Sequence, residues 1–352
     1  MWFSEPIRSK IALAGAIVNF MPSWWYGHYG IEYGERMVFD PDYRLDAYLK
    51  MRLIMHQRYA ALGMGSPNPE PCVIAPDWQN AQGPATAGAC IQYPVDNYPV
   101  SHHPSTVQLA TLHVPADVSK AWPFCESIRQ VRYLADKLGV EARPLLNARG
   151  VLNEAVLIRG EQVLGDLYSD PPAAQRLLDY AQGLIHAILR YNHGVDPGCG
   201  HMLFNCAEIM VSPNTYEQAL LGYDLETSQF CARLGHTLSV HHCGRFDDYA
   251  PLYRRLGALA LIEIGSESNV RMALDLFPEA EIQYIVPTAL MCRASRQDVG
   301  EHIDALLDET RGDWHRVRLN IPDLEYGMPD ENLFEAVEHL ARAAEEATCH
   351  ML

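Results

Sequence analysis

Basic residues are scarce in this sequence, and their scarcity narrows the kinds of partner that the protein can bind. The 352 residues include 27 lysines and arginines against 44 aspartates and glutamates, for a formal net charge of −17. Binding to the phosphates of a nucleic acid, or to an anionic membrane surface, requires a basic face. We therefore expect no nucleic-acid partner and no membrane partner.

Long apolar runs and paired cysteines are missing too. The longest apolar run, around residues 256–264, is far shorter than the ~20 residues that span a bilayer. The N-terminus carries Glu5, Arg8 and Lys10 where a signal peptide has its apolar core. The nine cysteines show no paired spacing, and an odd number favours reduced thiols over a disulfide framework. These features predict a soluble, cytoplasmic protein.

Several common site motifs do not occur either. The sequence has no GxGxxG or GxxxxGK[ST] motif, so nothing in it supports a nucleotide cofactor. It has no GxSxG motif, which leaves a serine hydrolase without support. The adjacent side chains of His102 and His103 diverge on an extended chain and are followed by Pro104, so we interpret them as loop residues.

From about residue 140, short apolar runs alternate with longer amphipathic segments, a pattern typical of repeated β–α units around a parallel sheet. We predict strands over residues 142–147, 200–206, 237–242, 258–264, 282–286 and 316–321. We predict helices over residues 171–191, 213–234, 246–256, 270–276, 296–310 and 329–347. Ser212-Pro213 and Ser169-Asp170-Pro171 each offer a capping side chain followed by a proline at a helix start.

The first hundred residues follow a different pattern. A long helix is predicted over residues 42–62, followed by a stretch rich in Pro, Gly and Asn and by a hairpin near residues 90–100. The segment also holds a cluster of aromatic side chains: Trp24, Trp25, Tyr26, His28 and Tyr29. Such a cluster suits a hydrophobic lid or an oligomer contact; alternatively, Trp25 and Tyr29 form a substrate-binding wall for a flat or methylated ligand.

The best candidate for a functional site is the segment His241-His242-Cys243-Gly244, at the carboxyl end of the predicted strand 237–242. In an α/β barrel, functional groups gather at this end of the strands. His241 and Cys243 stand two residues apart, so their side chains point to the same side of an extended backbone. An imidazole nitrogen and a thiolate that converge in this way form half of a zinc site. The alternative is that Cys243 is buried and that His242 is a core or helix-capping residue.

Residues 140–345 carry four motifs that resemble the uroporphyrinogen decarboxylase superfamily. They are Glu161-Gln162-Val163-Leu164 with Asp170-Pro171, Val211-Ser212-Pro213-Asn214-Thr215-Tyr216, His241-x-Cys243-Gly244, and Met328-Pro329-Asp330-Glu331-Asn332-Leu333. The resemblance implies an α/β fold, a (β/α)8 TIM barrel with an N-terminal α/β extension. It implies one domain over residues 1–352, in which 1–105 form the extension and lid and 106–352 form the main barrel units.

The histidine-x-cysteine-glycine motif is typical of the branch that contains the zinc-dependent methylcobamide:coenzyme M methyltransferases. The resemblance to this branch implies a zinc-dependent methyltransferase that moves a methyl group between a small molecule or thiol and a corrinoid. Methylcobalamin would then be held by a partner protein, a corrinoid protein, and a homodimer is common among such relatives. The decarboxylase itself matches less well, because its arginine-containing motif near the N-terminus is replaced here by Trp24-Trp25-Tyr26-Gly27-His28.

Two alternatives to the methyltransferase stay open. One is a lyase or decarboxylase that acts on a small carboxylated substrate at the same barrel mouth. The other is a binding or chaperone-like barrel that keeps the pocket without a complete site.

The sequence offers further candidate metal ligands outside this segment. Relatives carry another cysteine ligand where this chain reads Ile321-Pro322-Asp323-Leu324, so Asp323 is a candidate oxygen ligand or a turn residue. Cys292 is a candidate ligand from a neighbouring unit or a packed thiol. By analogy with cobalamin-independent methionine synthase, Glu263 is a further candidate, with Glu267 in second place, because a carboxylate inside an apolar strand is costly unless it is paired or metal-bound.

Contacts to the substrate are predicted on two strand ends. Asn205 and Glu208 follow the predicted strand 200–206, where relatives often carry acidic residues that face the pocket; the alternative is that they cap the next helix. Asn147 and Arg149 follow the predicted strand 142–147 and are candidates for binding a substrate carboxylate or phosphate.

Overall fold

The computed structural model describes residues 16–101, 107–310 and 313–350, and the side chains among them up to residue 342. Its main feature is a parallel sheet with the strand order β1-β8-β7-β6-β5-β4. The strands are β1 (Ala16–Phe20), β4 (His201–Phe204), β5 (Leu238–His242), β6 (Leu261–Ile264), β7 (Glu281–Ile285) and β8 (Val317–Leu324). The predicted α/β fold with a parallel sheet is therefore confirmed.

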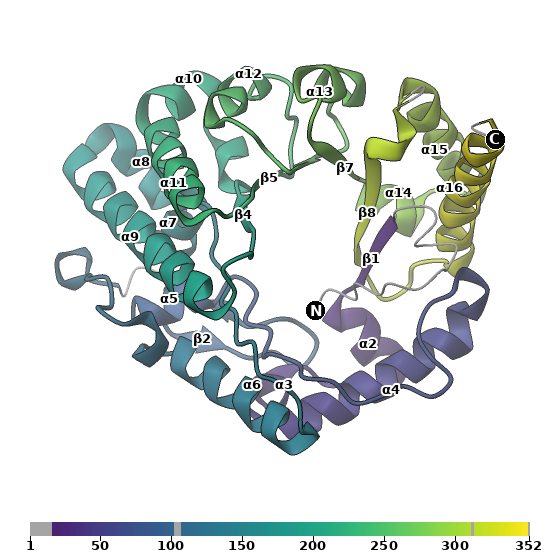
Figure 1. The fold of residues 1–352 in the computed structure, drawn as a ribbon, viewed down its shortest axis with the longest axis horizontal. Coiled ribbons are helices and arrows are strands. Elements are labelled where there is room, and N and C mark those ends of the chain that lie inside the picture. Colours follow the sequence, from purple (N-terminus) through teal and green to yellow (C-terminus); the bar gives the residue numbers. More distant parts are fainter. Residues whose placement is uncertain (1–15, 102–106, 311–312, 351–352) are drawn as a thin grey trace.

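The helices lie around this sheet, mostly on its outer side (Figure 1). Those of the N-terminal part are α2 (Pro22–Tyr29), α3 (Gly34–Phe39), α4 (Pro41–Tyr59), α5 (Gln82–Thr86) and α6 (Phe124–Leu138). Those that follow are α7 (Val151–Arg159), α8 (Gln162–Ser169), α9 (Pro171–Val195), α10 (Pro213–Thr215), α11 (Leu221–Leu234), α12 (Ala250–Tyr253), α13 (Val270–Leu276), α14 (Thr288–Arg293), α15 (Arg296–Thr310) and α16 (Asp330–His350). The boundaries predicted for α13 and α15 agree with the structure.

The six strands form an arc, and the pairing of β1 with β8 joins the two ends of the chain as a closing barrel requires (Figure 1). In the described residues no ladder extends beyond β4, and α3, α4 and α6 lie across the remaining side. The two-stranded hairpin of β2 (Ile91–Gln92) and β3 (Val100–Ser101) lies where the sequence predicted one. Of the eight-stranded barrel predicted from the sequence, the described residues thus show a six-stranded parallel sheet.

The strand predicted over residues 142–147 is wrong, because this segment makes its backbone hydrogen bonds elsewhere. The side chain of Asn192 accepts from the backbone N–H of Leu146 at 2.9 Å and donates to the Leu146 carbonyl at 2.8 Å. The bond from the Gly150 N–H to the Phe204 carbonyl, 3.3 Å, joins the end of this segment to β4. An asparagine on α9 thus takes the place of a neighbouring strand. The sequence also gave no signal for β1.

Caps define several helix starts, as the sequence indicated. The Ser212 hydroxyl accepts from the Thr215 N–H at 3.1 Å at the start of α10. Asp170, and not Ser169, caps α9 by accepting from the Ala173 N–H at 3.2 Å. Each cap satisfies a backbone donor that the first helical turn leaves without a partner.

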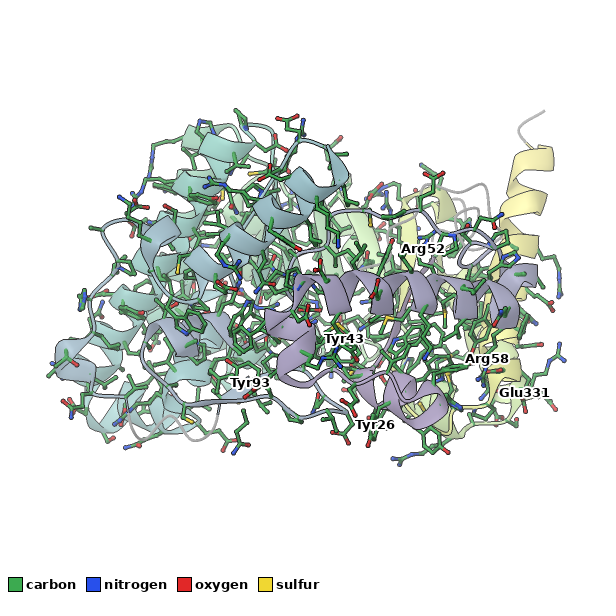
Figure 2. All side chains as sticks on the ribbon, turned by 90° about the horizontal axis from the view of Figure 1, so that it is seen from below. Tyr26, Tyr43, Arg52, Arg58, Tyr93 and Glu331 are labelled. Atoms are coloured by element: carbon green, nitrogen blue, oxygen red, sulfur yellow. The ribbon has the colours of Figure 1, made fainter. Side chains whose placement is uncertain are left out.

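The N-terminal helices are bound to the end of the chain by a buried aromatic cluster and an ion pair. Arg58 of α4 lies beside the start of α16, near Glu331 (Figure 2), and its guanidinium donates to both oxygens of Asp330, at 2.5 and 2.9 Å. Trp24 and Trp25 of α2 are completely buried. The aromatic segment thus forms part of the core that joins α2, α4 and α16.

Two sequence-based statements concern other parts of the chain. No helix among the described residues is both long and apolar enough to cross a membrane. His102 and His103, interpreted as loop residues, lie outside the described part of the chain.

Candidate metal centre

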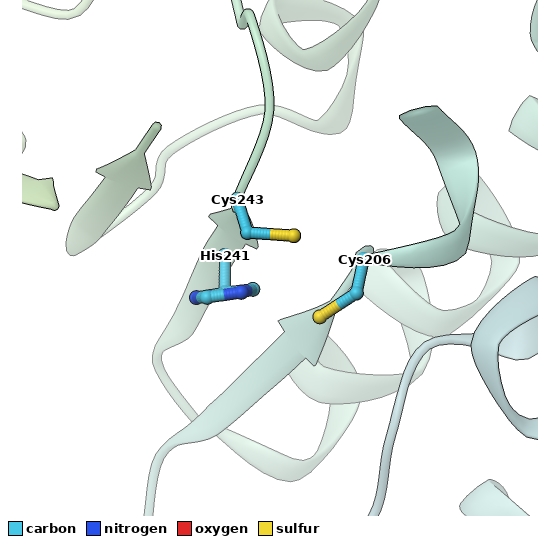
Figure 3. Close-up of side chains that lie close together, drawn as sticks. All are labelled: Cys206, His241 and Cys243. Carbon is cyan, nitrogen blue, oxygen red and sulfur yellow. The ribbon is translucent and has the colours of Figure 1, made fainter. Parts of the chain in front are cut away.

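Three side chains with good metal-ligand atoms converge where β4 and β5 end. One ligand atom from each of Cys206, His241 and Cys243 can be chosen so that all three lie within 4.8 Å of one another. In Figure 3 the two sulfur atoms point toward the space beside the imidazole ring. The structure therefore brings together His241 and Cys243, as the sequence predicted, and adds Cys206, which was not among the predicted ligands.

The register of β4 and β5 explains why Cys206 joins the pair. Phe204 and His241 are partners in the parallel ladder, and the Asn205 N–H continues it by donating to the His241 carbonyl at 2.8 Å. Cys206 and Cys243 each lie two residues beyond this last pair, so they stand opposite each other on adjoining chains. The sequence did contain a signal for this, a cysteine at the end of the predicted strand 200–206, but only the pairing of the two strands gives it a partner.

His241 is oriented by a carboxylate on the next strand. His241 and Glu263 are partners in the β5–β6 ladder, and the Nδ1 atom of His241 is hydrogen-bonded to Oε2 of Glu263. The other oxygen, Oε1, accepts from the side-chain amides of Gln283, at 2.6 Å, and Asn320. With Nδ1 engaged in this way, Nε2 is the ring nitrogen that remains for a metal, and Glu263 orients the ligand without belonging to the group itself. Gln283 and Asn320, polar residues inside apolar strands, were not singled out from the sequence.

The charges around the group favour a thiolate. A hydrogen bond from Cys206, opposed by burial and reinforced by a hydrogen bond from His241, lowers the pKa of the Cys243 thiol to about 5. The same hydrogen bond, together with burial, raises the pKa of Cys206. Burial lowers the pKa of His241, but the hydrogen bonds to Cys243 and Glu263 outweigh it and raise the pKa to about 9.

Two sulfurs and one imidazole nitrogen are a donor set that fits zinc. Zinc sites combine thiolates and histidines in tetrahedral geometry, and catalytic sites keep one position open for a water or a substrate. Three protein ligands, an outer carboxylate on the histidine and a thiolate-favouring environment all agree with such a site.

Asp323 and Cys292, the other predicted metal ligands, do not belong to this group. Asp323 is the next-to-last residue of β8 and has a φ of 56°, in the left-handed region. Burial, followed by the charges of Glu325 and Cys243, raises the pKa of its carboxyl. Cys292 lies on α14 and packs, partly buried, against the hydrophobic core. Cys206, in contrast, directly follows β4 and lies in the group.

Asn205 and Glu208, predicted to contact the substrate, are buried beside the Cys206 turn. Asn205 is 0% exposed and donates to Asp224 at 2.7 Å, and the Tyr216 hydroxyl donates to the same carboxylate oxygen at 2.6 Å. Glu208 is 1% exposed, and burial and the neighbouring Asp224 raise the pKa of its carboxyl well above the usual value. The bond from Asn205 to Asp224 holds the turn that carries Cys206, whereas Oε2 of the buried Glu208 has no hydrogen-bond partner among the described residues. Asp224 was missed at the sequence level.

The remaining predicted substrate contacts differ in their access. The guanidinium of Arg149 lies 4.7 Å from the centre of the Phe204 ring and donates to the Gln79 carbonyl at 2.6 Å. The centre of the Phe204 ring lies 5.6 Å from that of the His241 ring. Asn147 is exposed and lines, with Arg149 and Glu154, a cavity of about 10 Å³, enough for one water.

The two aromatic candidates are engaged in the N-terminal core. Trp25 is 0% exposed and packs on Phe20 and Trp24, so it has no surface to offer a ligand in this conformation. The Tyr29 hydroxyl accepts from Arg58 at 3.2 Å.

Comparison with known proteins agrees with this architecture. The model of the uroporphyrinogen decarboxylase family matches residues 81–347. The chain belongs to this family. A methyltransferase from Methanosarcina mazei has a similar structure, with a TM-score of 0.61 over 98% of this chain and 96% of that chain, at 13% sequence identity. At this identity the likeness shows a shared fold. No curated protein matches the sequence.

In this member of the uroporphyrinogen decarboxylase family, the motifs of the resemblance serve different purposes. The segment around His241 carries site residues, whereas Ser212 caps a helix and Asp330 binds Arg58. The Asn332 amide donates to the carbonyls of Met291 and Ala294, both at 3.0 Å, and so ties α16 to the end of α14. The motif that contains Asp330 and Asn332 is therefore structural.

Proposed function

We propose that this protein is a zinc-dependent methyltransferase that moves a methyl group between a small molecule or thiol and a corrinoid carrier. The observation that carries the proposal is the convergence of Cys206, His241 and Cys243 at the carboxyl ends of β4 and β5. Three protein ligands leave one position of a tetrahedral site for the substrate. The Methanosarcina mazei methyltransferase, which shares the fold, supports the reaction class.

Each ligand has a defined part in this proposal. Cys206 and Cys243 supply two thiolates, and His241 supplies Nε2 because Glu263 engages Nδ1. When bound, zinc would lower the pKa of a substrate thiol, so that the thiolate needed as methyl acceptor or product forms at neutral pH. Glu263 keeps the imidazole in one orientation, and Gln283 and Asn320 keep Glu263 in place.

Other residues hold the turn and the substrate. Asn205, Asp224 and Tyr216 form the buried network that fixes the turn after β4, and Glu208 packs in the same turn. Arg149 stands over Phe204 beside the group and would bind an anionic end of the substrate, with the exposed Asn147 next to it. A corrinoid protein that carries methylcobalamin, a homodimer and a cytoplasmic location are further parts of the proposal.

The decisive experiment is metal analysis of the purified protein and of three variants. We expect about one zinc ion per chain in the wild type and a large loss of zinc in Cys206→Ser, His241→Ala and Cys243→Ser. Cys292→Ser is the matched control, because Cys292 is also a partly buried thiol but lies outside the group; it should keep its zinc.

Replacement of zinc by cobalt(II) reports on the ligands directly. The wild type should show thiolate-to-cobalt charge-transfer bands, which weaken in each cysteine variant of the group and shift when a substrate thiol is added. A wild-type protein that binds neither metal would overturn the methyltransferase proposal and favour the lyase alternative in the same barrel mouth.

A further inference from the structure

Cys206 and Cys243 are close enough to each other to be considered as a disulfide pair as well as metal ligands. They occupy equivalent positions on two adjoining parallel chains, each two residues after the last ladder pair, Phe204 and His241. Neighbouring strands lie about 4.8 Å apart, which is inside the range of about 4.4–6.8 Å between the Cα atoms of disulfide-bonded cysteines. The two sulfur atoms already lie within 4.8 Å of each other.

We infer that Cys206 and Cys243 form a reversible disulfide under oxidising conditions, and that this modification empties the metal site. The inference rests on the proposed function for its consequence, the release of zinc, but not for the bond itself. Both cysteines are free thiols in the structure and neither is fully buried, so a small oxidant can reach them. A disulfide needs a sulfur–sulfur distance of about 2.05 Å, so the bond requires the two side chains to turn toward each other from their present separation of up to 4.8 Å.

The reaction balances with hydrogen peroxide as the oxidant. The Cys243 sulfur attacks one peroxide oxygen, the O–O bond breaks, and a sulfenic acid and hydroxide form. The Cys206 sulfur then attacks the sulfenic sulfur, the S–S bond forms, and the sulfenic oxygen leaves as hydroxide. Two protons convert both hydroxides to water; they come from the thiols of the metal-free pair, or from solvent when the two thiolates hold zinc. One peroxide and the two cysteines thus give one disulfide and two waters.

The consequence for the site follows from the ligand count. A disulfide sulfur is no longer a thiolate, so oxidation removes two of the three ligands in one step and leaves His241 alone. A single histidine does not hold zinc in competition with solvent. Reduction by a dithiol restores both ligands. The pair would thus couple the activity of the site to the redox state of its surroundings.

The test treats the zinc-loaded wild-type protein with stoichiometric hydrogen peroxide and follows three quantities. We expect the intact mass to fall by the two hydrogens of one disulfide, two thiols per chain to become unreactive, and one zinc to appear in a chromogenic chelator assay. Dithiothreitol with added zinc should reverse all three changes. Peptide mapping after alkylation identifies the linked residues without any variant.

Variants separate this pair from other thiols. Cys206→Ser should stop at oxidised Cys243, with added oxygen instead of lost hydrogen, whereas Cys292→Ser should behave as the wild type. A disulfide that maps elsewhere, for example between Cys199 and Cys231, or an unlinked pair after zinc loss would overturn the inference. If the protein binds no zinc but the 206–243 disulfide forms, the bond is confirmed and the proposed function fails. If zinc is bound and the pair resists oxidation, the disulfide inference is overturned and the proposed metal site stands.

Discussion

His241 and Glu263 stand opposite each other on β5 and β6, and the carboxylate engages the Nδ1 atom of the imidazole. This pairing gives the candidate site a fixed histidine orientation before any metal binds. An outer carboxylate that holds a metal-binding histidine typically contributes 10–100-fold to metal affinity. The residue is therefore useful to the site even though it is not placed to bind the metal.

Glu263→Gln should weaken zinc binding by about 10–100-fold while the protein stays folded. A glutamine cannot accept from His241, Gln283 and Asn320 at once without presenting its own amide hydrogens to one of these donors. Competition with a calibrated chelator measures the change. Glu267→Gln, in the exposed loop after the same strand, is the control and should bind zinc as the wild type does; equal affinities for both variants would show that the pairing has no effect on the metal.

Glu154→Gln should remove a pH-dependent loss of stability. Burial raises the pKa of Glu154 to about 7 from a usual value of 4.5, and Arg149 opposes this shift only in part. When folding raises the pKa of a carboxyl, its contribution to the free energy of unfolding is largest below the unfolded pKa, here 4.5. This contribution is lost as the pH rises to the folded pKa of about 7. The variant should therefore gain up to about 3 kcal/mol over the wild type at pH 8 and almost nothing at pH 4.5.

Urea unfolding of both proteins across this pH range measures the difference. Glu141→Gln is the control, because it makes the same change at an exposed position. Its difference in the free energy of unfolding from the wild type should not follow the pH course expected for Glu154→Gln. A constant offset between wild type and Glu154→Gln at all pH values would contradict the assignment.

Asp224→Ala should be one of the most destabilising single substitutions near the site. It removes the acceptor for the Tyr216 hydroxyl and the Asn205 amide, and each buried donor left without a partner costs about 1–3 kcal/mol. The expected loss in the free energy of unfolding is about 2–5 kcal/mol, with weaker zinc binding because Asn205 adjoins Cys206.

Asp179 offers a matched control for this substitution. Its carboxylate also accepts from a tyrosine hydroxyl, Tyr223, and from an amide, Gln175, both at 2.9 Å, but the residue is exposed. Asp179→Ala should change the free energy of unfolding by about 0.5 kcal/mol or less. Similar losses in the two variants would show that burial does not set the cost.

Asp330→Ala should loosen the attachment of α16 to the N-terminal helices. Asp330 accepts two hydrogen bonds from Arg58 and one from the Tyr59 hydroxyl at 2.6 Å, so its removal should cost about 1–3 kcal/mol. Asp42 accepts from Lys137 and Tyr133 at the surface, and Asp42→Ala should cost much less. Thermal unfolding compares them, and hydrogen exchange in α16 should rise only in Asp330→Ala; unchanged exchange there would argue against the link.

The sequence alone determined the features that depend on neighbours along the chain. Alternating segments predicted the parallel α/β class, β4 to β8 and the limits of α13 and α15, because periodicity reflects which faces a segment buries. A proline and a capping side chain marked the starts of α9 and α10. The two-residue spacing of His241 and Cys243 placed both side chains on one side of β5, which is a local property of an extended chain.

Only the tertiary structure decided the features that depend on contacts between distant segments. Cys206 joins the site because β4 and β5 pair in one register, and Glu263 serves His241 because β5 and β6 pair in another. In the segment over residues 142–147, predicted as a strand, the backbone of Leu146 bonds to the side chain of Asn192, far along the chain. Trp25, a candidate for the substrate wall, is buried in the core. Side-chain spacing fixes directions along one strand, whereas a site also needs the partners that strand pairing and packing bring opposite it.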